Sequence, residues 1–438
     1  MSKGRILPLL LLLAALTLAA CGRRAEETPP PEEAPPAEDT APAAEVPELP
    51  PDLPEGASTL TAEEIARVNE AFTPVFTDEE KNVSRANPLD SFFTGYYQTP
   101  EEIDLSVFLE YSSLSREETG GDGVISPEEY AALTALEDWS FERDRPQEDM
   151  SVPIHRFPRD RVDDFLMEYA GVTTEDLTAP WTTGLYCLEN FDAYYNTTSD
   201  FGPGVFQCES GWYTDTEARL TGRDSVLTLE KREDRWLIRS FLPEGAAPLT
   251  AEEIAQVNEA FQPDVERDGV SCVNPLTCFV SSYYRWPEEL DLSALLRHFS
   301  PGAELSGEAE FEALKAAEDW PFGDISRDRM PVPIHKYLRS DVDAGLQKHM
   351  GITTEHLYSV PYSGPGAEEY SRSSPFLYLP EYEAYYNFVS DVDPGYFQCT
   401  SGWYSESMAR LTGDTQVLTL GNWNGTWLFR SFLPLKTE

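Results

Sequence analysis

An internal duplication constrains this fold more than any other feature, because two long stretches of the sequence each occur twice. Residues 60–72 (LTAEEIARVNEAF) recur as residues 249–261 (LTAEEIAQVNEAF). Residues 206–213 (FQCESGWY) recur as residues 397–404 (FQCTSGWY). Self-similarity over this length indicates one structural unit that is built twice.

The matches extend over most of the chain, so we predict two tandem repeat domains: repeat 1, residues 58–245, and repeat 2, residues 246–438. The offset between matched positions is 189 residues at the start of the unit (249 − 60), 180 at a shared histidine (335 − 155) and 191 at a shared tryptophan (427 − 236). A change in offset locates an insertion, and we expect these insertions to be surface loops.

Each unit begins with signals for a helix. Thr61 is a candidate N-cap, and Glu64 completes a capping box with it. Ile65, Val68 and Phe72 then share one helical face. The sequence therefore predicts an amphipathic helix at the start of each repeat.

A second helix is predicted over residues 162–170, where Val162 and Leu166 share one side. Gly171 in repeat 1 and Gly351 in repeat 2 are expected to end it, because glycine tolerates the left-handed conformation of a helix C-terminus.

The last third of each unit is rich in β-forming residues. Residues 226–229 and 236–241 are strand-like runs, and Asn424-Gly425 is a strong hairpin signal in repeat 2. Helices followed by strands predict an α+β domain with helices packed on one face of an antiparallel sheet. A cone of helices and a curved sheet, similar to the NTF2-like fold, is one architecture of this kind.

The charge of the chain bounds its partners. The formal net charge is −46, and no basic patch is visible in the sequence. Phosphate groups would be repelled, so nucleic acid is not an expected partner.

The cysteines do not form a recognisable framework. Their number after Cys21 is odd and no Cys-x-x-Cys pair occurs, so we expect small buried thiols and no shared disulfide pattern. They are Cys187, Cys208, Cys272, Cys278 and Cys399.

The start of the chain has the three parts of a secretion signal. Lys3 and Arg5 precede an apolar run over residues 6–18, which is too short for a comfortable membrane span, and small residues lead to Cys21. The ending Leu-Ala-Ala-Cys resembles the lipobox of bacterial lipoproteins. This resemblance implies that residues 1–20 are removed and that Cys21 carries fatty acyl groups, which would hold the chain at the bacterial cell membrane on its extracytoplasmic side.

The segment after the lipobox has a different composition. Residues 25–56 contain no Lys or Arg and are dominated by Pro, Ala and Glu. Such a segment buries too little apolar surface to fold, so we predict a disordered tether over residues 21–57. At about 3.1 Å per residue it would reach on the order of 100 Å when fully extended.

One segment suggests a calcium site. Residues 120–129 (GGDGVISPEE) look like the second half of an EF-hand loop, with Gly123 at the turn position and Ile125 at the apolar position. The alternative is a glycine-rich turn in which Ser126 caps a helix that starts at Pro127. No cofactor other than this calcium ion is expected. The candidate ligands are Glu118, Asp122, Ser126 and Glu129.

Histidine and aromatic side chains are the remaining site candidates. His155 and His335 occupy the same Pro-Ile-His context and are candidate bases or ligands, or else structural histidines. Recurring aromatic residues suit recognition of a glycan or peptide, or else packing in the core and sheets. These candidates are Tyr195, Tyr386, Trp212 and Trp403.

The anchor, the tether and the duplication together suit display and bivalent binding. We therefore expect a non-enzymatic surface or binding lipoprotein with a protein or glycan ligand. The alternative is a cell-envelope hydrolase that uses a cleft near His155 or His335.

Overall fold

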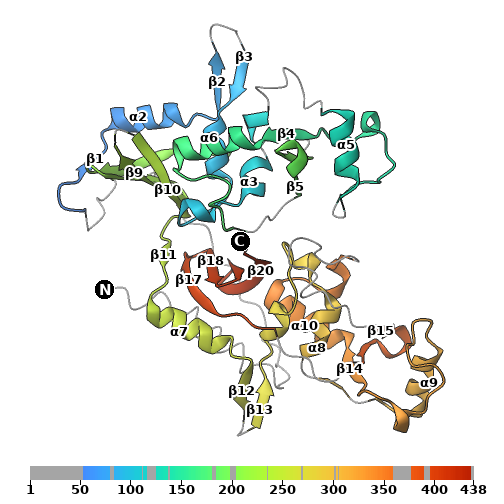
Figure 1. The fold of residues 1–438 in the computed structure, drawn as a ribbon. Coiled ribbons are helices and arrows are strands. Elements are labelled where there is room, and N and C mark those ends of the chain that lie inside the picture. The colour runs from blue at the N-terminus through green and yellow to red at the C-terminus, as the bar shows by residue number, and fades with distance from the viewer. Residues whose placement is uncertain are drawn as a thin grey trace, which may run out of the picture.

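The fold is a mixture of helices and antiparallel sheets, which confirms the α+β prediction (Figure 1). It is known from a computed structural model. The residues described are 53–78, 83–110, 112–115, 125–136, 139–179, 184–197, 204–233, 235–267, 270–299, 302–303, 305–358, 376–388 and 395–435. Cys21, the signal-like segment and tether residues 21–52 lie outside these residues, as do Glu118 and Asp122. The last five residues of the predicted disordered tether, 53–57, are described and form a turn in which the Ala57 N–H donates to the Pro54 carbonyl (3.0 Å).

Each repeat has a five-stranded antiparallel sheet with the same strand order. In repeat 1 the order is β1-β7-β8-β9-β10, and in repeat 2 it is β11-β17-β18-β19-β20. The strands of the first sheet are β1 Ser58–Thr59, β7 Cys208–Tyr213, β8 Glu217–Gly222, β9 Ser225–Arg232 and β10 Arg235–Pro243. Those of the second are β11 Ala247–Pro248, β17 Cys399–Tyr404, β18 Met408–Gly413, β19 Gln416–Trp423 and β20 Thr426–Pro434.

Two smaller sheets are also repeated. A three-stranded sheet has the order β4-β6-β5 in repeat 1 and β14-β16-β15 in repeat 2, and β2-β3 and β12-β13 are two-stranded. The bounds are β4 His155–Pro158, β5 Leu185–Leu188, β6 Ala193–Asn196, β14 His335–Leu338, β15 Phe376–Leu379 and β16 Ala384–Asn387. The two-stranded sheets are β2 Val75–Asp78 with β3 Val83–Ala86, and β12 Asp264–Arg267 with β13 Val270–Val273.

The first helix of each repeat forms as the sequence predicts. Helix α2 (Ala62–Ala71) is capped by Thr61 in a complete capping box with Glu64, and α7 (Ala251–Ala260) has the same box. Each helix is fixed to its sheet by an asparagine. Asn69 Nδ2 donates to the Cys208 carbonyl (2.9 Å), and the Cys208 N–H donates to Asn69 Oδ1 (2.7 Å).

The corresponding asparagine of repeat 2 makes the same pair of bonds, with distances of 2.9 and 2.7 Å between Asn258 and Cys399. Both cysteines lie where a β-bulge interrupts the ladder between strands. The asparagine amide therefore satisfies backbone groups that the bulge would leave without partners.

The second predicted helix is also confirmed. Helices α6 (Arg159–Tyr169) and α10 (Arg339–Met350) lie on the first and second large sheets, respectively. Gly171 and Gly351 follow them with φ values of 72° and 77°, in the left-handed region that glycine tolerates.

The remaining helices are short. They are α3 Leu105–Glu110, α5 Pro127–Thr134, α8 Leu292–His298 and α9 Glu308–Ala316. Three-residue or slightly longer 3-10 helices, notably η1 Pro88–Phe93, η6 Thr277–Val280 and η7 Pro287–Glu289, lead into α3 and α8.

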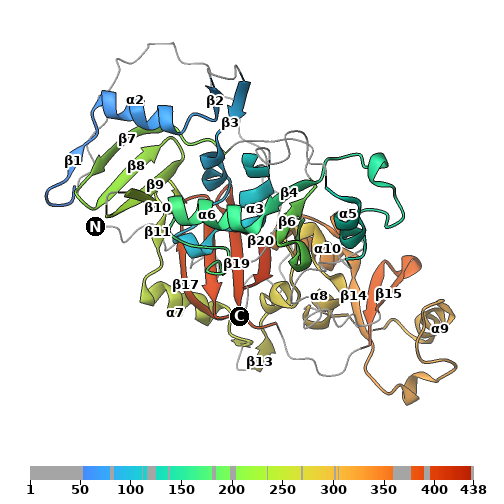
Figure 2. The same ribbon diagram turned by 45° about the horizontal axis from the view of Figure 1, so that its top comes forward.

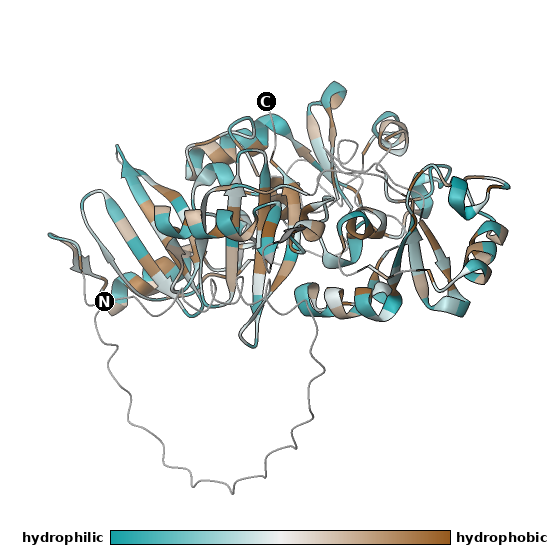
Figure 3. Ribbon diagram, turned by 90° about the horizontal axis from the view of Figure 1, so that it is seen from below, coloured by the Kyte–Doolittle hydropathy of each residue, from teal (hydrophilic) through white to brown (hydrophobic). Residues whose placement is uncertain are grey.

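The predicted hairpin in repeat 2 is present between β19 and β20. Asn424 and Gly425 both have positive φ, 51° and 84°, as a two-residue type I′ turn requires. Hydrophobic and hydrophilic residues alternate along many of the strands (Figure 3), which gives each large sheet an inner face against helices and an outer face.

Each repeat has its own cores. In each, a large core lies between the five-stranded sheet and its helices, and a smaller core lies on the other side of the three-stranded sheet, next to α5 or α9. None of these clusters draws buried residues from both repeats. The tyrosine pair of β6 divides between the two cores, because successive side chains of a strand point to opposite faces: Tyr194 enters the large core and Tyr195 the small one.

The connection between the repeats is short. Strand β10 ends at Pro243, a turn with Gly245 at a φ of 72° follows, and β11 begins at Ala247. Beyond this turn, α3 of repeat 1 lies next to the large sheet of repeat 2, as Figures 1 and 2 both show.

Across the part of the chain that the structure describes, no helix is both long enough and apolar enough to span a bilayer.

Candidate functional site

A pocket of about 740 Å³ opens between the two repeats, and both contribute side chains to its walls. This volume lies within the range of small-molecule sites. Repeat 1 contributes η1, the segment that follows it, and α3, whereas repeat 2 contributes the outer face of its large sheet and one tryptophan from the segment before η7. We call this site the inter-repeat pocket.

The repeat 1 wall is held by local hydrogen bonds. Ser91 Oγ bonds to Ser112 Oγ (2.9 Å), and Thr94 Oγ1 donates to the Ser91 carbonyl (2.8 Å). Tyr97 pairs through its backbone with Phe241 of β10, with N···O distances of 2.9 and 3.0 Å. The wall is thereby attached to the edge of its own sheet.

Helix α3 presents one side to the pocket. Val107 and Glu110 of α3 line it, as does Asp104, which precedes the helix by one residue. Asp104 also accepts hydrogen bonds from the Ser106 N–H (2.9 Å) and hydroxyl (2.6 Å), which fixes the start of the helix.

The repeat 2 wall follows from strand alternation. Trp403, Met408, Arg410 and Thr419 line the pocket, whereas strand neighbours such as Leu411 enter the core on the other face. Trp403 is only 1% exposed. The Tyr96 ring of repeat 1 meets it edge-on, with centroids 6.3 Å apart, so this aromatic pair joins the two repeats.

Trp286 is the exposed member of the wall, at 53% exposure. Its backbone is constrained on both sides. Tyr284 exchanges backbone hydrogen bonds of 2.8 and 2.9 Å with Phe432 of β20, and the Trp286 carbonyl accepts the N–H of Glu289 in η7 (2.9 Å). The pocket therefore includes an open indole on a rigid support.

Charges of both signs face the pocket. Asp104 and Glu110 come from repeat 1 and Arg410 from repeat 2. Burial raises the pKa of Tyr96, and the nearby carboxylate of Asp224 raises it further. Burial also raises the pKa of Tyr97 well above its ordinary value.

Several polar atoms in or behind these walls have no hydrogen-bond partner among the described residues: Tyr97 Oη, Trp403 Nε1, Arg410 Nε and both Asp90 carboxylate oxygens. Asp90, in η1 behind the wall, is 4% exposed, and burial raises its pKa to about 7. The corresponding residue in repeat 2 is Thr277 (277 − 90 = 187, as for Tyr283 and Tyr96), whose hydroxyl donates to the Asn274 carbonyl (2.7 Å).

The four predicted aromatic site residues do not lie together in the structure. Trp403 lies in the inter-repeat pocket, whereas Trp212 is half-buried on the outer face of the repeat 1 sheet. Tyr195 and Tyr386 are fully buried, so the alternative of core packing holds for both.

The two buried tyrosines belong to matching polar clusters. Tyr195 Oη donates to Glu129 Oε1 (2.6 Å), which also accepts from Arg156 Nε (2.8 Å). In repeat 2, Tyr386 Oη donates to Glu310 Oε1 (2.5 Å), and Lys336 Nζ is 2.7 Å from the same oxygen. We call these clusters the buried acid triads.

The hydrogen bonds of the triads set the charge of their carboxylates. Burial alone would raise the pKa of each glutamate. The hydrogen bonds to Glu129 from Tyr195, Ser126 and Arg156 outweigh this effect and lower its pKa. Those to Glu310 from Lys336, Tyr386 and Ser306 do the same, so both carboxylates are held in the ionised form.

Glu129 is both a candidate calcium ligand and a member of the buried acid triad in repeat 1. Ser126 caps α5 in a complete capping box with Glu129, which confirms the alternative interpretation for these two residues. Both Glu129 oxygens already accept hydrogen bonds, Oε2 from the Ser126 N–H (2.8 Å). Among the described residues, no group of three or more His, Cys, Asp or Glu side chains is placed to hold a metal ion. Because Glu118 and Asp122 lie outside the described residues, calcium binding stays a prediction.

The two histidines occupy matching strands in different environments. His155 on β4 is 5% exposed, whereas His335 on β14 is exposed. Neither lines the inter-repeat pocket. The pairing of their strands with β6 and β16 places His155 opposite Asn196 and His335 opposite Asn387.

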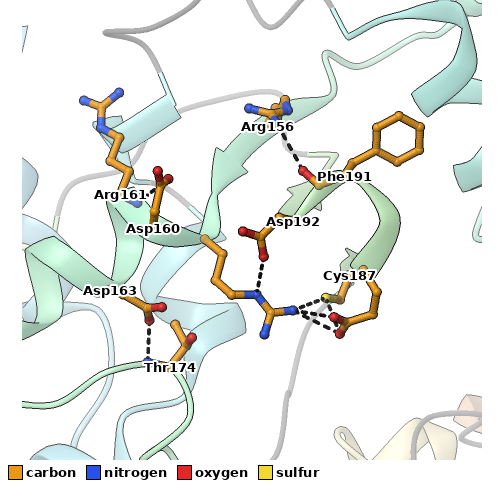
Figure 4. Close-up of polar contacts among 10 residues, drawn as sticks. Arg156, Asp160, Arg161, Asp163, Thr174, Cys187, Phe191 and Asp192 are labelled. Carbon is orange, nitrogen blue, oxygen red and sulfur yellow. Dashed lines mark hydrogen bonds and ion pairs between the residues drawn. The ribbon is translucent and has the colours of Figure 1, made fainter.

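The acidic residues that follow His155 accept backbone hydrogen bonds at α6 and at the turn after it (Figure 4), and Asp160 Oδ1 accepts the Arg161 N–H (2.7 Å). Asp163 Oδ1 accepts the Thr174 N–H (2.7 Å). Arg159 forms ion pairs of 3.0 Å with Glu189 and with Asp192. In repeat 2, Arg339 pairs with Asp343 and Glu355. In repeat 1 the ion pairs of Arg159 therefore join the helix to the three-stranded sheet, whereas in repeat 2 the pair with Glu355 joins the helix to the turn that follows it.

The described cysteines are free thiols, as expected: Cys208, Cys278 and Cys399 are buried and Cys187 is half-buried. Burial raises the pKa of Cys208 and of Cys399 to about 11, which keeps both thiols protonated.

Sequence reasoning missed several pocket residues, of which Trp286, Met408 and Arg410 are three from repeat 2. Two of them differ between the repeats: Trp286 stands where repeat 1 has Thr99 (286 − 99 = 187), and Met408 where it has Glu217 (408 − 217 = 191). Apolar residues in repeat 2 at positions where repeat 1 has polar ones are therefore the sequence signal that indicates this site.

No protein-family model matches the chain, and neither a curated protein nor a solved structure shows significant similarity to it.

Proposed function

We propose that this chain is a lipid-anchored, extracytoplasmic binding protein that takes a ligand into the inter-repeat pocket. The observation that carries the binding role is the pocket itself, about 740 Å³ in volume, with aromatic walls and a few charged groups. The lipobox-like ending at Cys21 supports the membrane address, and the tether would hold the binding unit away from the bilayer.

The proposal includes two tandem domains, each a helix-plus-sheet unit similar to the NTF2-like cone. Separate cores in the two repeats and identical strand orders support it. Ligand sites occur preferentially where two domains meet, as the inter-repeat pocket does.

A hydrolase acting at His155 or His335 has less support. His155 is buried, and neither histidine reaches the inter-repeat pocket. Asp160 and Asp163, which follow His155 in sequence, accept backbone hydrogen bonds at α6 and at the turn after it.

The membrane address is tested by labelling. A bacterial host that expresses the full chain is supplied with radiolabelled palmitate and then fractionated. Cys21→Ala is expected to lose the label and leave the membrane fraction, whereas Cys187→Ala, which removes a thiol outside the lipobox, keeps both. Label on the Cys21→Ala chain would contradict the anchor.

The binding role is tested by ligand retention. The purified chain is incubated with a cell-envelope extract, washed, and its retained small molecules are identified by mass spectrometry. Met408→Glu places the repeat 1 carboxylate in the pocket and is expected to abolish retention. The matched control Glu217→Met makes the reverse change outside the pocket and should retain the same molecule. Equal retention by all three chains would contradict a pocket site.

A further inference from the structure

Resting on the proposed function, we infer that the inter-repeat pocket binds a neutral oligosaccharide, with one sugar ring stacked on the exposed face of Trp286. A sugar ring combines a flat apolar face of C–H groups with a rim of hydroxyl groups. The walls of the pocket offer the same two kinds of surface.

The apolar surface is Trp286. At 53% exposure it is one of the most open large apolar side chains among the described residues, and it borders a concave site. Its backbone is held by the β20 edge and by η7, so stacking would immobilise little additional chain. Its counterpart Thr99 offers no such face, which sets this position apart from the repeated scaffold.

The polar rim contains donors and acceptors together. Arg410 supplies N–H donors, Asp104 and Glu110 supply carboxylate oxygens, and Thr419 supplies a hydroxyl that can do either. A hydroxyl group donates and accepts at once, so a polyol can satisfy both kinds of partner. Hydrogen bonds to charged groups are about twice as strong as those between neutral groups.

Other ligand classes fit these walls less well. An anion would meet two carboxylates on a chain whose formal net charge is −46. A wholly apolar molecule would leave the Nε of Arg410, which has no hydrogen-bond partner among the described residues, still without one. A small organic cation would be attracted by the two carboxylates, but it offers Arg410 no acceptor and so satisfies fewer of the polar groups than a polyol does.

The experiment uses residues 21–438 with Cys21→Ala, so that both repeats and the tether are present and the chain is not acylated. It is applied to an array of neutral and anionic glycans, and the best neutral glycan is titrated calorimetrically. Choline and a neutral tripeptide are titrated as probes of the other classes. Trp286→Ala is expected to weaken the affinity for the neutral glycan about tenfold or more.

Trp423→Ala is the matched control. Trp423 is 66% exposed and ends β19 next to the hairpin turn, and it does not line the pocket. Both tryptophans are exposed, so neither substitution removes core packing. Loss of glycan binding in Trp286→Ala with retention in Trp423→Ala supports the inference.

The remaining outcomes separate the two proposals. Binding of anionic glycans alone, or glycan binding that Trp286→Ala leaves unchanged, overturns the saccharide inference. Trp286-dependent binding of choline or the tripeptide without glycan binding also overturns it, but leaves the pocket as a binding site. If no probe binds, the saccharide inference is overturned, and ligand retention in the Met408→Glu experiment then decides the proposed function by itself.

Discussion

The outer faces of the two large sheets have the same origin and different surroundings. On repeat 2 this face carries Trp403, Met408 and Arg410 and is covered by repeat 1. On repeat 1 the matching positions are Trp212, Glu217 and Arg219; Trp212 is half-buried, and the other two are exposed. The tryptophan and the arginine occur in both repeats. On the covered face, however, repeat 2 has Met408 where repeat 1 has Glu217.

The comparison teaches which residues maintain the scaffold and which serve the site. Capping boxes, bulge asparagines and acid triads occur in both repeats and hold the same elements in both. Trp286 and Met408, by contrast, differ from their counterparts in repeat 1 and lie where one repeat meets the other. The two repeats can therefore be used as controls for each other. A residue of one repeat is placed at the matching position of the other, or matching residues are removed from both.

The largest effect is expected at His349, which is buried in repeat 2 where repeat 1 has Tyr169 (349 − 169 = 180). Burial, with a smaller contribution from Lys348, lowers the pKa of His349 to about 3. Between an ordinary value of about 6.5 and this one, the unfolded chain binds a proton that the folded chain does not. The free energy of unfolding should therefore fall by up to about 5 kcal/mol as the pH falls through this window.

His349→Tyr copies repeat 1 and should remove that loss of stability. Urea unfolding at several pH values between about 7 and 4 measures it in the full chain. The same slope in the wild type and the variant would show that His349 does not stay neutral in the folded protein.

Asp90 is expected to act in the opposite direction in repeat 1. Burial raises its pKa to about 7, so the folded chain keeps a proton that the unfolded chain has lost. Stability should fall as the pH rises from about 4 to 7, by up to about 4 kcal/mol, and stay reduced above that range.

Asp90→Thr copies Thr277 of repeat 2 and should stabilise the chain much more at pH 8 than at pH 4. Thermal unfolding at the two pH values provides the test. Equal stabilisation at both would mean that charge burial is not the cause.

The acid triads should differ in their sensitivity. The Glu310 and Lys336 side chains are 1% and 7% exposed, whereas those of Glu129 and Arg156 are 10% and 29% exposed. Removing one partner of a buried pair leaves the other charge without compensation. Glu310→Ala is therefore expected to lower the free energy of unfolding by about 3 kcal/mol, and Glu129→Ala by less because water can reach Arg156.

Glu312→Ala is the control for this pair, since its side chain is 56% exposed in the same helix as Glu310. Urea unfolding of the three variants gives the order. A Glu129→Ala loss as large as that of Glu310→Ala would argue that exposure of the cation does not matter.

The smallest effect is expected at the hairpin tips. Glu233 of repeat 1 has a φ of 57° and corresponds to Asn424 of repeat 2, which has a φ of 51° (424 − 233 = 191). Asparagine tolerates this left-handed conformation better than glutamate. Glu233→Asn should stabilise the chain by about 0.5 kcal/mol and Asn424→Glu should destabilise it similarly, as measured by thermal unfolding. Shifts of the same sign in both variants would contradict this explanation.

Local signals predicted much of the fold. The Thr61 capping box, the glycines after α6 and α10 and the Asn424-Gly425 turn each depend on residues close in sequence, and all three are present. Sequence reasoning also detected Trp403 through the duplication. It could not place Trp403 beside Tyr96, because that contact depends on how the repeats meet.

The acid triads show a different limit. Glu129 was interpreted as part of a calcium loop and Tyr195 as part of an aromatic pair, yet they share a hydrogen bond across 66 positions of sequence. Nothing in either local pattern indicates the other residue. Each triad combines a glutamate, a cation and a tyrosine that lie far apart in sequence, so the sequence shows three separate residues in each repeat and not the cluster that they form.

The turn between Pro243 and Ala247 gives the pocket a property that neither repeat has alone. A connection this short keeps the two walls at a high effective concentration, of the order of millimolar, whatever the dilution of the protein. Cleavage by a protease at Gly245 would remove this advantage and make ligand capture depend on how many cut molecules share the same volume. Ligand binding by the intact chain would then be independent of the protein concentration, whereas ligand binding by the cut chain would weaken on dilution.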